Sequence, residues 1–187
     1  MSNPSVPPLP HAPDAVAARI GGHLGLALPV LHPVAAAALP APCRELLVHE
    51  DSMTATLERR WGEPVVIDCI ASAVSEPDRT LDRFVVLRTG RTGVVVELAT
   101  IRIHLDTVAE SLRPAVIAGG RPFGAILAGA GIAFRGRPIA YFRLQADAQI
   151  ADRCAVPEGA TLYGRLNQLV RADGTVLCET VEILPRA

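Results

Sequence analysis

The sequence contains no lysine, so all 18 of its permanently basic side chains are arginines. Because Schiff-base chemistry and lysine-anchored pyridoxal phosphate both need a side-chain amine, this absence excludes them. Arginine offers instead a planar, permanently charged group that binds carboxylates through two parallel hydrogen bonds. This inventory suits a carboxylate ligand, although a bias in composition would produce the same inventory.

The sequence also shows no arrangement of cysteine and histidine that is typical of a metal site. Its four cysteines contain no C-x-x-C pair, and its five histidines lack the spacing of zinc ligands. No uninterrupted apolar stretch is long enough to span a bilayer, and the N-terminus lacks a basic region followed by an apolar one. We therefore expect no metal, no membrane partner and a cytoplasmic protein with reduced thiols.

Neither sign of charge dominates, because the formal net charge is −1 and the arginines are scattered rather than clustered. A nucleic-acid-binding protein has a basic patch or stripe, so we expect no nucleic-acid partner. The length of 187 residues suits one domain. Residues 1–13 are rich in proline and predict a flexible arm, which leaves residues 14–187 as a single domain.

The hydrophobic patterns predict helices and strands in separate groups. Helical periodicity begins at Asp14 and returns in SMTATLERRW, where Asp51 or Ser52 is expected to cap the helix. The later patterns predict strands at 64–74, 81–88 and 93–103, helices at 105–120 and 121–131, and two further hairpins at 134–146 and 161–184. Because no β-α-β unit repeats, this order predicts an α+β fold with an antiparallel sheet of about six strands and helices packed on one face.

Among the charged residues within the predicted strand patterns, five stand out: Arg83, Glu97, Arg165, Glu179 and Glu182. A charge between apolar strand neighbours either points to solvent on the alternate face or enters a pocket where burial requires a partner. For any one of these residues solvent exposure is the simpler interpretation. The five together indicate a convergent site.

Several segments resemble the chorismate pyruvate-lyase family. The stretch LLVHEDSMT is similar to the start of a helix in that family and is the most specific of the matches. The stretches LDRFVVLRTG, RPFGAIL, LYGRLNQL and DGTVLCETVEILP match further patterns of the family in the same order. The resemblance covers residues 43–187 and implies a chorismate lyase-like fold, in which an antiparallel sheet and its helices enclose a ligand cavity.

The resemblance implies a lyase that needs no cofactor and that releases pyruvate from chorismate to give 4-hydroxybenzoate. Arg83 matches the arginine that holds the ligand carboxylate in this family, and Arg165 is a second candidate anchor. Met53 and Phe123 match positions around the aromatic ring, although plain core packing would also explain both. Because elimination aromatises the substrate, such a protein need only anchor carboxylates, exclude water and move a proton.

The glutamate of the family near the C-terminus has no direct counterpart in this chain. Counted back from Pro185, its place falls on Val181, with Glu182 one position nearer the proline and Glu179 two positions further away. Strand alternation puts Glu182 on the face opposite to Val181 and Glu179. We favour Glu182 as hydrogen-bond partner or proton acceptor and keep Glu179 as the alternative, while the additional Glu97 favours a related cyclic carboxylate as substrate.

A non-catalytic alternative is the UTRA-like effector-binding domain of some bacterial transcription regulators. These domains resemble the lyases in fold and resemble this chain in its C-terminal pattern. Such regulators carry a basic winged-helix domain ahead of the sensor, and the N-terminal segment here is too short and too poor in basic residues for one. We therefore expect an enzyme that acts on a small-molecule carboxylate, as a monomer or a homodimer.

Overall fold

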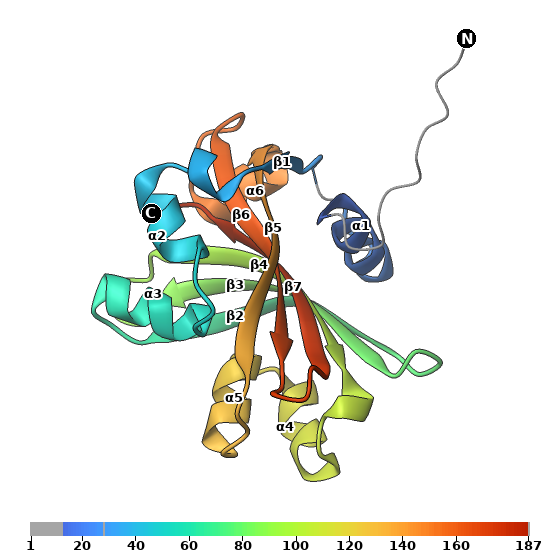
Figure 1. Ribbon diagram of the computed structural model, residues 1–187. Coiled ribbons are helices and arrows are strands. Elements are labelled where there is room, and N and C mark those ends of the chain that lie inside the picture. Colours follow the sequence, from blue (N-terminus) through green and yellow to red (C-terminus); the bar gives the residue numbers. More distant parts are fainter. Residues whose placement is uncertain (1–12, 28, 187) are drawn as a thin grey trace.

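A computed structural model of the chain describes residues 13–27 and 29–186. Its central element is a seven-stranded sheet with the strand order β1-β5-β6-β7-β4-β3-β2, in which every neighbouring pair is antiparallel (Figure 1). The strands are β1 (His32–Val34), β2 (Val65–Ser75), β3 (Thr80–Thr89), β4 (Val95–His104), β5 (Arg135–Gln145), β6 (Thr161–Val170) and β7 (Val176–Leu184). Because β7 lies between β4 and β6, the C-terminal strand joins the two halves of the sheet.

Short helices connect and cover the strands. They are α1 (Pro13–Leu24), α2 (Ala41–Leu47), α3 (Met53–Trp61), α4 (Arg113–Ala118), α5 (Phe123–Gly129) and α6 (Ala148–Cys154), with 3-10 turns η1 (Ala36–Ala38), η2 (Leu105–Thr107) and η3 (Glu110–Leu112). Helix α3 ends at Gly62, whose φ of 67° is a left-handed conformation that glycine adopts without strain. Helix α6 begins where Asp147 accepts a hydrogen bond from the Ile150 backbone at 2.8 Å.

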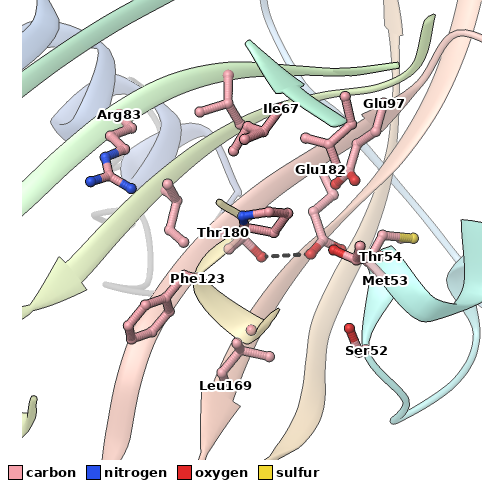
Figure 2. A pocket seen from close by; sticks show the side chains of 15 residues that line it. Ser52, Met53, Thr54, Ile67, Arg83, Glu97, Phe123, Leu169, Thr180 and Glu182 are labelled. Atoms are coloured by element: carbon pink, nitrogen blue, oxygen red, sulfur yellow. Dashed lines mark hydrogen bonds between the residues drawn. The ribbon is translucent and has the colours of Figure 1, made fainter. Parts of the chain in front are cut away.

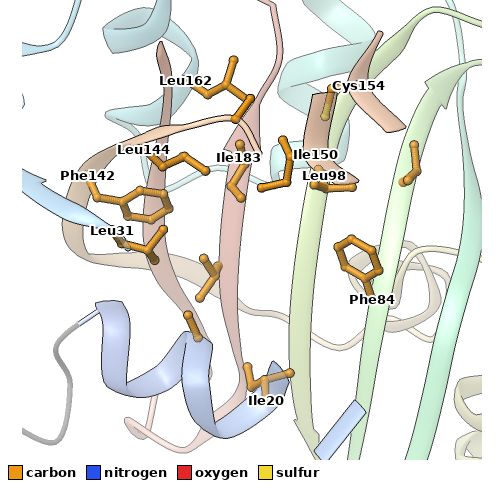
Figure 3. Packing of buried hydrophobic residues seen from close by; sticks show 14 of the residues in the cluster. Ile20, Leu31, Phe84, Leu98, Phe142, Leu144, Ile150, Cys154, Leu162 and Ile183 are labelled. Atoms are coloured by element: carbon orange, nitrogen blue, oxygen red, sulfur yellow. The ribbon is translucent and has the colours of Figure 1, made fainter. Parts of the chain in front are cut away.

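One face of the sheet carries a core that α1 and α6 complete. Phe84 of β3 and Leu98 of β4 pack there with Ile183 of β7. Ile20 of α1 and Ile150 of α6 belong to the same cluster, and Figure 3 shows these side chains gathered between the strands and the helices. We call this side of the sheet the back face.

The opposite side, which we call the pocket face, is covered by α2 to α5. Val85 of β3 points there, because strand residues alternate between faces. Leu57 of α3 packs in one cluster with Val85, whereas Phe123 of α5 packs in a separate cluster with Leu81. The helices therefore meet the sheet in two separate clusters on this face.

The predicted α+β fold with an antiparallel sheet is confirmed, and details of the elements differ from the prediction. The sheet has seven strands rather than about six, and α1 and α6 pack on the back face in addition to the helices on the pocket face. Strand β1 escaped prediction because it is a short edge strand that contains proline. The range 105–120 is divided between two 3-10 turns and α4 rather than forming one helix. The range 134–146 forms the single strand β5 rather than the predicted hairpin, whereas 161–184 is a hairpin of β6 and β7.

The predicted proline-rich arm, residues 1–13, lies outside the described residues except for Pro13, which begins α1. Across residues 13–27 and 29–186, none of the helices combines the length and the apolar character that a membrane span requires. Within the same ranges, no group of three or more histidine, cysteine, aspartate and glutamate side chains is arranged to hold a metal ion.

Candidate functional site

A pocket opens between the pocket face of the sheet and the first turns of α3 and α5. It encloses about 630 Å³ of space free of protein atoms, part of it open to solvent. Small-molecule sites have mostly apolar walls with a few polar groups, and this pocket shares that character. The lining residues are Ser52, Met53, Thr54, Ile67, Arg83, Val85, Leu87, Glu97, Ile101, Pro122, Phe123, Gly124, Leu169, Thr180 and Glu182 (Figure 2).

Arg83 is the cation of this pocket. Its side chain projects from β3, and the residue is only 2% exposed. Two guanidinium nitrogens, Nε and one Nη, have no hydrogen-bond partner among the described residues. Burial lowers the pKa of Arg83 from its ordinary value, which reflects a charge that is removed from water without a compensating acceptor.

The backbone of Gly119 lies beside the Arg83 guanidinium, just after α4. A Cβ atom at this glycine would stand 3.4 Å from Cζ of Arg83, and the glycine has a φ of 72°. An L-residue with a side chain rarely adopts this conformation. Glycine therefore lets the segment between α4 and α5 close over the arginine.

Two carboxylates lie at the other end of the pocket, as Figure 2 shows. Glu182 of β7 accepts hydrogen bonds from Arg165 and, at 3.0 Å, from the Thr180 hydroxyl. Glu97 of β4 is 3% exposed. Burial and the nearby Glu182 raise the pKa of Glu97 well above its ordinary value, whereas Arg165 lowers it by less.

Arg165 lies behind Glu182 and is not part of the pocket lining. It is fully buried on β6, directly opposite Glu182 on β7. Besides Glu182, it donates to the backbone oxygens of Leu47 at 2.8 Å and His49 at 3.1 Å. The structure thus uses Arg165 to fix Glu182 and the segment after α2, and leaves Arg83 as the arginine that faces the pocket.

Glu179 lies on the back face, away from the pocket. It forms an ion pair with Arg19 of α1 and accepts a hydrogen bond from Gln168 at 3.4 Å. Glu182 lies three positions after Glu179 along β7, so regular alternation places the two carboxylates on opposite faces. Of the two glutamates considered from the sequence, Glu182 is the one at the pocket.

Met53 and Phe123 both line the pocket and are both nearly buried. Each is the first residue of its helix, α3 and α5 respectively, and each also belongs to an apolar cluster of the core. Both side chains therefore pack in the core and also line the pocket, and their contact with a ligand stays a prediction. Ser52 occupies the N-cap position of α3, but its side chain makes no capping hydrogen bond and lines the pocket instead.

Sequence reasoning missed most of the apolar wall and the hydroxyl of Thr180. The wall includes Val85 and Leu87, which follow Arg83 at alternate positions of β3. That alternation was a usable signal, because residues that share parity with a pocket arginine share its face. Leu169 and Thr180 reach the pocket from β6 and β7, where they share parity with Arg165 and Glu182 respectively, so the same signal would have indicated them.

Comparison with known proteins reveals relatives in structure alone. No protein-family profile matches the chain, and no curated protein matches it in sequence. A crystal structure of PhnF from Mycobacterium smegmatis matches with a TM-score of 0.57 and 17% identity, covering 73% of this chain and 64% of that chain. The chain thus spans somewhat less than two thirds of that structure.

Two further crystal structures match over most of their own length. The effector domain of PhnF from Mycobacterium smegmatis has a TM-score of 0.57 and 16% identity, covering 82% of this chain and 91% of that chain. The gene product SA0254 from Staphylococcus aureus has a TM-score of 0.52 and 6% identity, covering 72% of this chain and 87% of that chain. At such identities the likeness establishes the fold alone, which is the chorismate lyase-like fold shared by these structures.

The prediction of a carbon–oxygen lyase is wrong. It carried an activity over from a resemblance in pattern, and the structures that share this fold are a PhnF and its effector domain, with no lyase among those named above. A fold alone does not specify a reaction. Chorismate as substrate, 4-hydroxybenzoate and pyruvate as products, and a place in aromatic biosynthesis are withdrawn with the lyase.

The argument against an effector-binding domain also fails. It rested on the short segment ahead of the predicted domain, yet the effector domain of PhnF has this fold as a separate crystal structure and is matched over 91% of its length. The length of that segment therefore does not separate an enzyme from an effector domain.

Proposed function

We propose that this chain is a non-catalytic domain that binds a small anionic molecule, as an effector, in the pocket beside Arg83. The observation that carries the proposal is the state of Arg83, which is 2% exposed, lines the pocket, and has two nitrogens without partners among the described residues. Burying an unpaired charge destabilises a protein, because desolvation costs several kcal/mol per ion, so packing alone does not explain this arginine. An oxyanion in the pocket would supply the missing acceptors.

The surroundings of Arg83 suit a small organic anion. The guanidinium fork matches a carboxylate or phosphate group through two parallel hydrogen bonds, and each hydrogen bond to a charged group contributes about 1.5–3 kcal/mol. Beyond the arginine, the walls formed by Val85, Phe123 and Leu169 are apolar. Such walls exclude water and strengthen the ion pair, because the local dielectric is low.

The roles we propose for the other residues follow from their positions. Met53 and Phe123 contact the ligand from the first turns of α3 and α5, and Glu182 accepts hydrogen bonds at the far end of the pocket. Arg165 positions Glu182 rather than touching the ligand, and Glu179 serves the attachment of α1. The shared fold with the effector domain of PhnF supports a binding role for the domain as a whole. We keep the prediction of a monomer or a homodimer, which light scattering of the purified protein measures.

The test compares the wild type with Arg83→Met and Arg88→Met. Arg88 is a matched control because it lies on the same strand, outside the pocket lining, and pairs with the exposed Asp68. Each protein is incubated with the low-molecular-mass fraction of a bacterial cell extract and analysed by native mass spectrometry. We expect a compound with a carboxylate or phosphate group to bind the wild type and Arg88→Met, and to bind Arg83→Met at least about tenfold more weakly.

The same experiment contains the outcomes that contradict the proposal. The bound compound, once released, should have the same mass as the compound added, and its conversion to a product would restore an enzymatic role. Equal binding by Arg83→Met and the wild type would remove Arg83 as the anchor. Arg83→Met should fold, because the substitution removes a buried charge that has no partner among the described residues; circular dichroism checks this.

A further inference from the structure

Glu97 is, after Arg83, the second charged residue of the pocket that forms no hydrogen bond or ion pair among the described residues. It lies on β4 opposite Leu87 of β3, whereas Arg83 lies four residues before Leu87 on the same strand, or about 13 Å along it. Between these positions the pocket is lined by apolar side chains of β2 and β3, namely Ile67, Val85 and Leu87. The pocket therefore has two polar ends separated by an apolar middle.

At the Glu97 end of the pocket, carboxylates outnumber cations. Glu182 on the adjacent strand β7 and Arg165 on β6, one strand further away, act on Glu97. The start of α3 contributes the uncharged Met53 and Thr54, with the N-cap residue Ser52, to this part of the lining. Arg165 donates to Glu182 through Nε and to two backbone oxygens through one Nη, while its other Nη has no partner among the described residues. One cation thus serves two carboxylates, and among the described residues Glu97 has no cation to itself.

A ligand that carries only an anion would complete one end of the pocket and leave the other unpaired. Resting on the proposed function, we infer that the effector is an amino acid-like molecule, with an oxyanion bound by Arg83 and a protonated amine bound by Glu97 across an apolar spacer. Both buried charges then have a partner of opposite sign, and the pocket with its ligand is balanced. A hydroxyl group would supply a hydrogen bond to Glu97 but no charge.

The inference also sets the proton balance of binding. Burial beside Glu182 raises the pKa of Glu97, which favours the protonated acid in the empty pocket. An ammonium group requires the carboxylate, so the acid proton leaves to solvent when the amine binds, and the ligand keeps its own proton. Binding of an amine-bearing ligand is therefore accompanied by release of a proton, whereas its uncharged analogue releases none.

The test uses matched probes with the same anion and spacer. They are 4-(aminomethyl)benzoate, 4-(hydroxymethyl)benzoate and 4-methylbenzoate, together with the flexible pair 6-aminohexanoate and hexanoate. Titration calorimetry in two buffers of different ionisation enthalpy measures affinity and proton release together. In the wild type we expect an amine probe to bind at least about tenfold more tightly than its methyl or unsubstituted partner, with release of a proton.

Glu97→Gln should abolish this preference for the amine, because it keeps the shape of the side chain and removes the charge. Glu45→Gln, which alters an exposed residue of α2, should leave the preference unchanged. Equal affinity for the amine and hydroxyl probes, or a preference that survives in Glu97→Gln, would overturn the inference.

The two proposals fail in different ways. If no amine probe binds but native mass spectrometry detects another anion whose binding requires Arg83, the amine-bearing ligand is refuted and the binding function stands. If Arg83→Met binds every probe and every extracted compound as the wild type does, the proposed function itself fails.

Discussion

Replacing Glu97 with glutamine should stabilise the empty protein, and the gain should grow with pH. Burial and Glu182 raise the pKa of Glu97 above the ordinary value of 4.5. Below that ordinary value, the residue is protonated in both the folded and the unfolded chain, so it does not oppose folding. As the pH rises, the unfolded chain loses this proton first, and the free energy of unfolding falls until the pH passes the pKa of the folded state. Glutamine does not titrate and escapes this loss.

The size of the effect follows from the one proton involved. Within the window between the two pKa values, a difference of one bound proton changes the free energy of unfolding by about 1.4 kcal/mol per pH unit. For a chain of this length, each kcal/mol corresponds to a shift in Tm of about 2–4 °C. The gap in Tm between Glu97→Gln and the wild type should therefore widen by about 3–6 °C per pH unit in this window.

Urea unfolding of both proteins, followed by circular dichroism at several values between about pH 5 and pH 7, measures the difference in the free energy of unfolding, and thermal unfolding at the same pH values measures the difference in Tm. The exposed substitution Glu45→Gln provides the baseline, because it removes a carboxylate that water already solvates. A stability difference between Glu97→Gln and the wild type that stays constant across this range would refute the reasoning. It would mean that the Glu97 carboxyl group is solvated or paired in the folded protein.

Three further predictions concern residues around the pocket. Arg165→Met should destabilise the protein by about 3–5 kcal/mol in urea unfolding, because it leaves Glu182 buried without its cation; retention of wild-type stability would show that Glu182 is hydrated. Gly164→Ala should cost about 3 kcal/mol or more in the same assay, because its Cβ would stand 2.2 Å from the Glu182 backbone oxygen; a neutral result would contradict this close approach. Iodoacetamide should modify Cys69 in the native protein well before Cys154, because Cys69 is exposed whereas burial raises the pKa of Cys154 to about 11; peptide mass spectrometry measures the order.

The pairing of Arg165 with Glu182 was within reach of the sequence. The Asp173-Gly174 turn predicts a hairpin, and counting outward equally from a turn centred between these two residues places Arg165 opposite Glu182. The structure has this pair in register despite a shift between Leu169 and Val170. The turn residues thus indicated that Arg165 pairs with a carboxylate of the protein. By elimination, they indicated that Arg83 is the arginine available to a ligand.

The convergence of Arg83 and Glu97 on one pocket with Glu182 was not within reach in the same way. Alternation assigns each residue to a face of its own strand, but it does not say which strands are neighbours. Here β7 inserts between β4 and β6, and this long-range pairing brings Glu182 beside β4, where Glu97 lies. A register shift at the end of β3, between Leu87 and Arg88, also limits how far alternation can be extended along the hairpin.

The same physical argument explains why the resemblance predicted the fold and not the activity. Its most specific stretch, EDSMT, surrounds the start of α3, where Met53 packs in the core and also lines the pocket. Phe123 does the same at the start of α5. Residues that both pack in the core and line the pocket are needed wherever these helices cover this sheet, whichever ligand the pocket binds. The groups that would select a ligand are Arg83 and Glu97, which lack partners of their own among the described residues, and a lone charge within a strand pattern is a weak signal in sequence. A sequence pattern that serves the packing of helices therefore identifies the fold. The chemistry of the site depends instead on which buried charged groups the fold leaves without a partner.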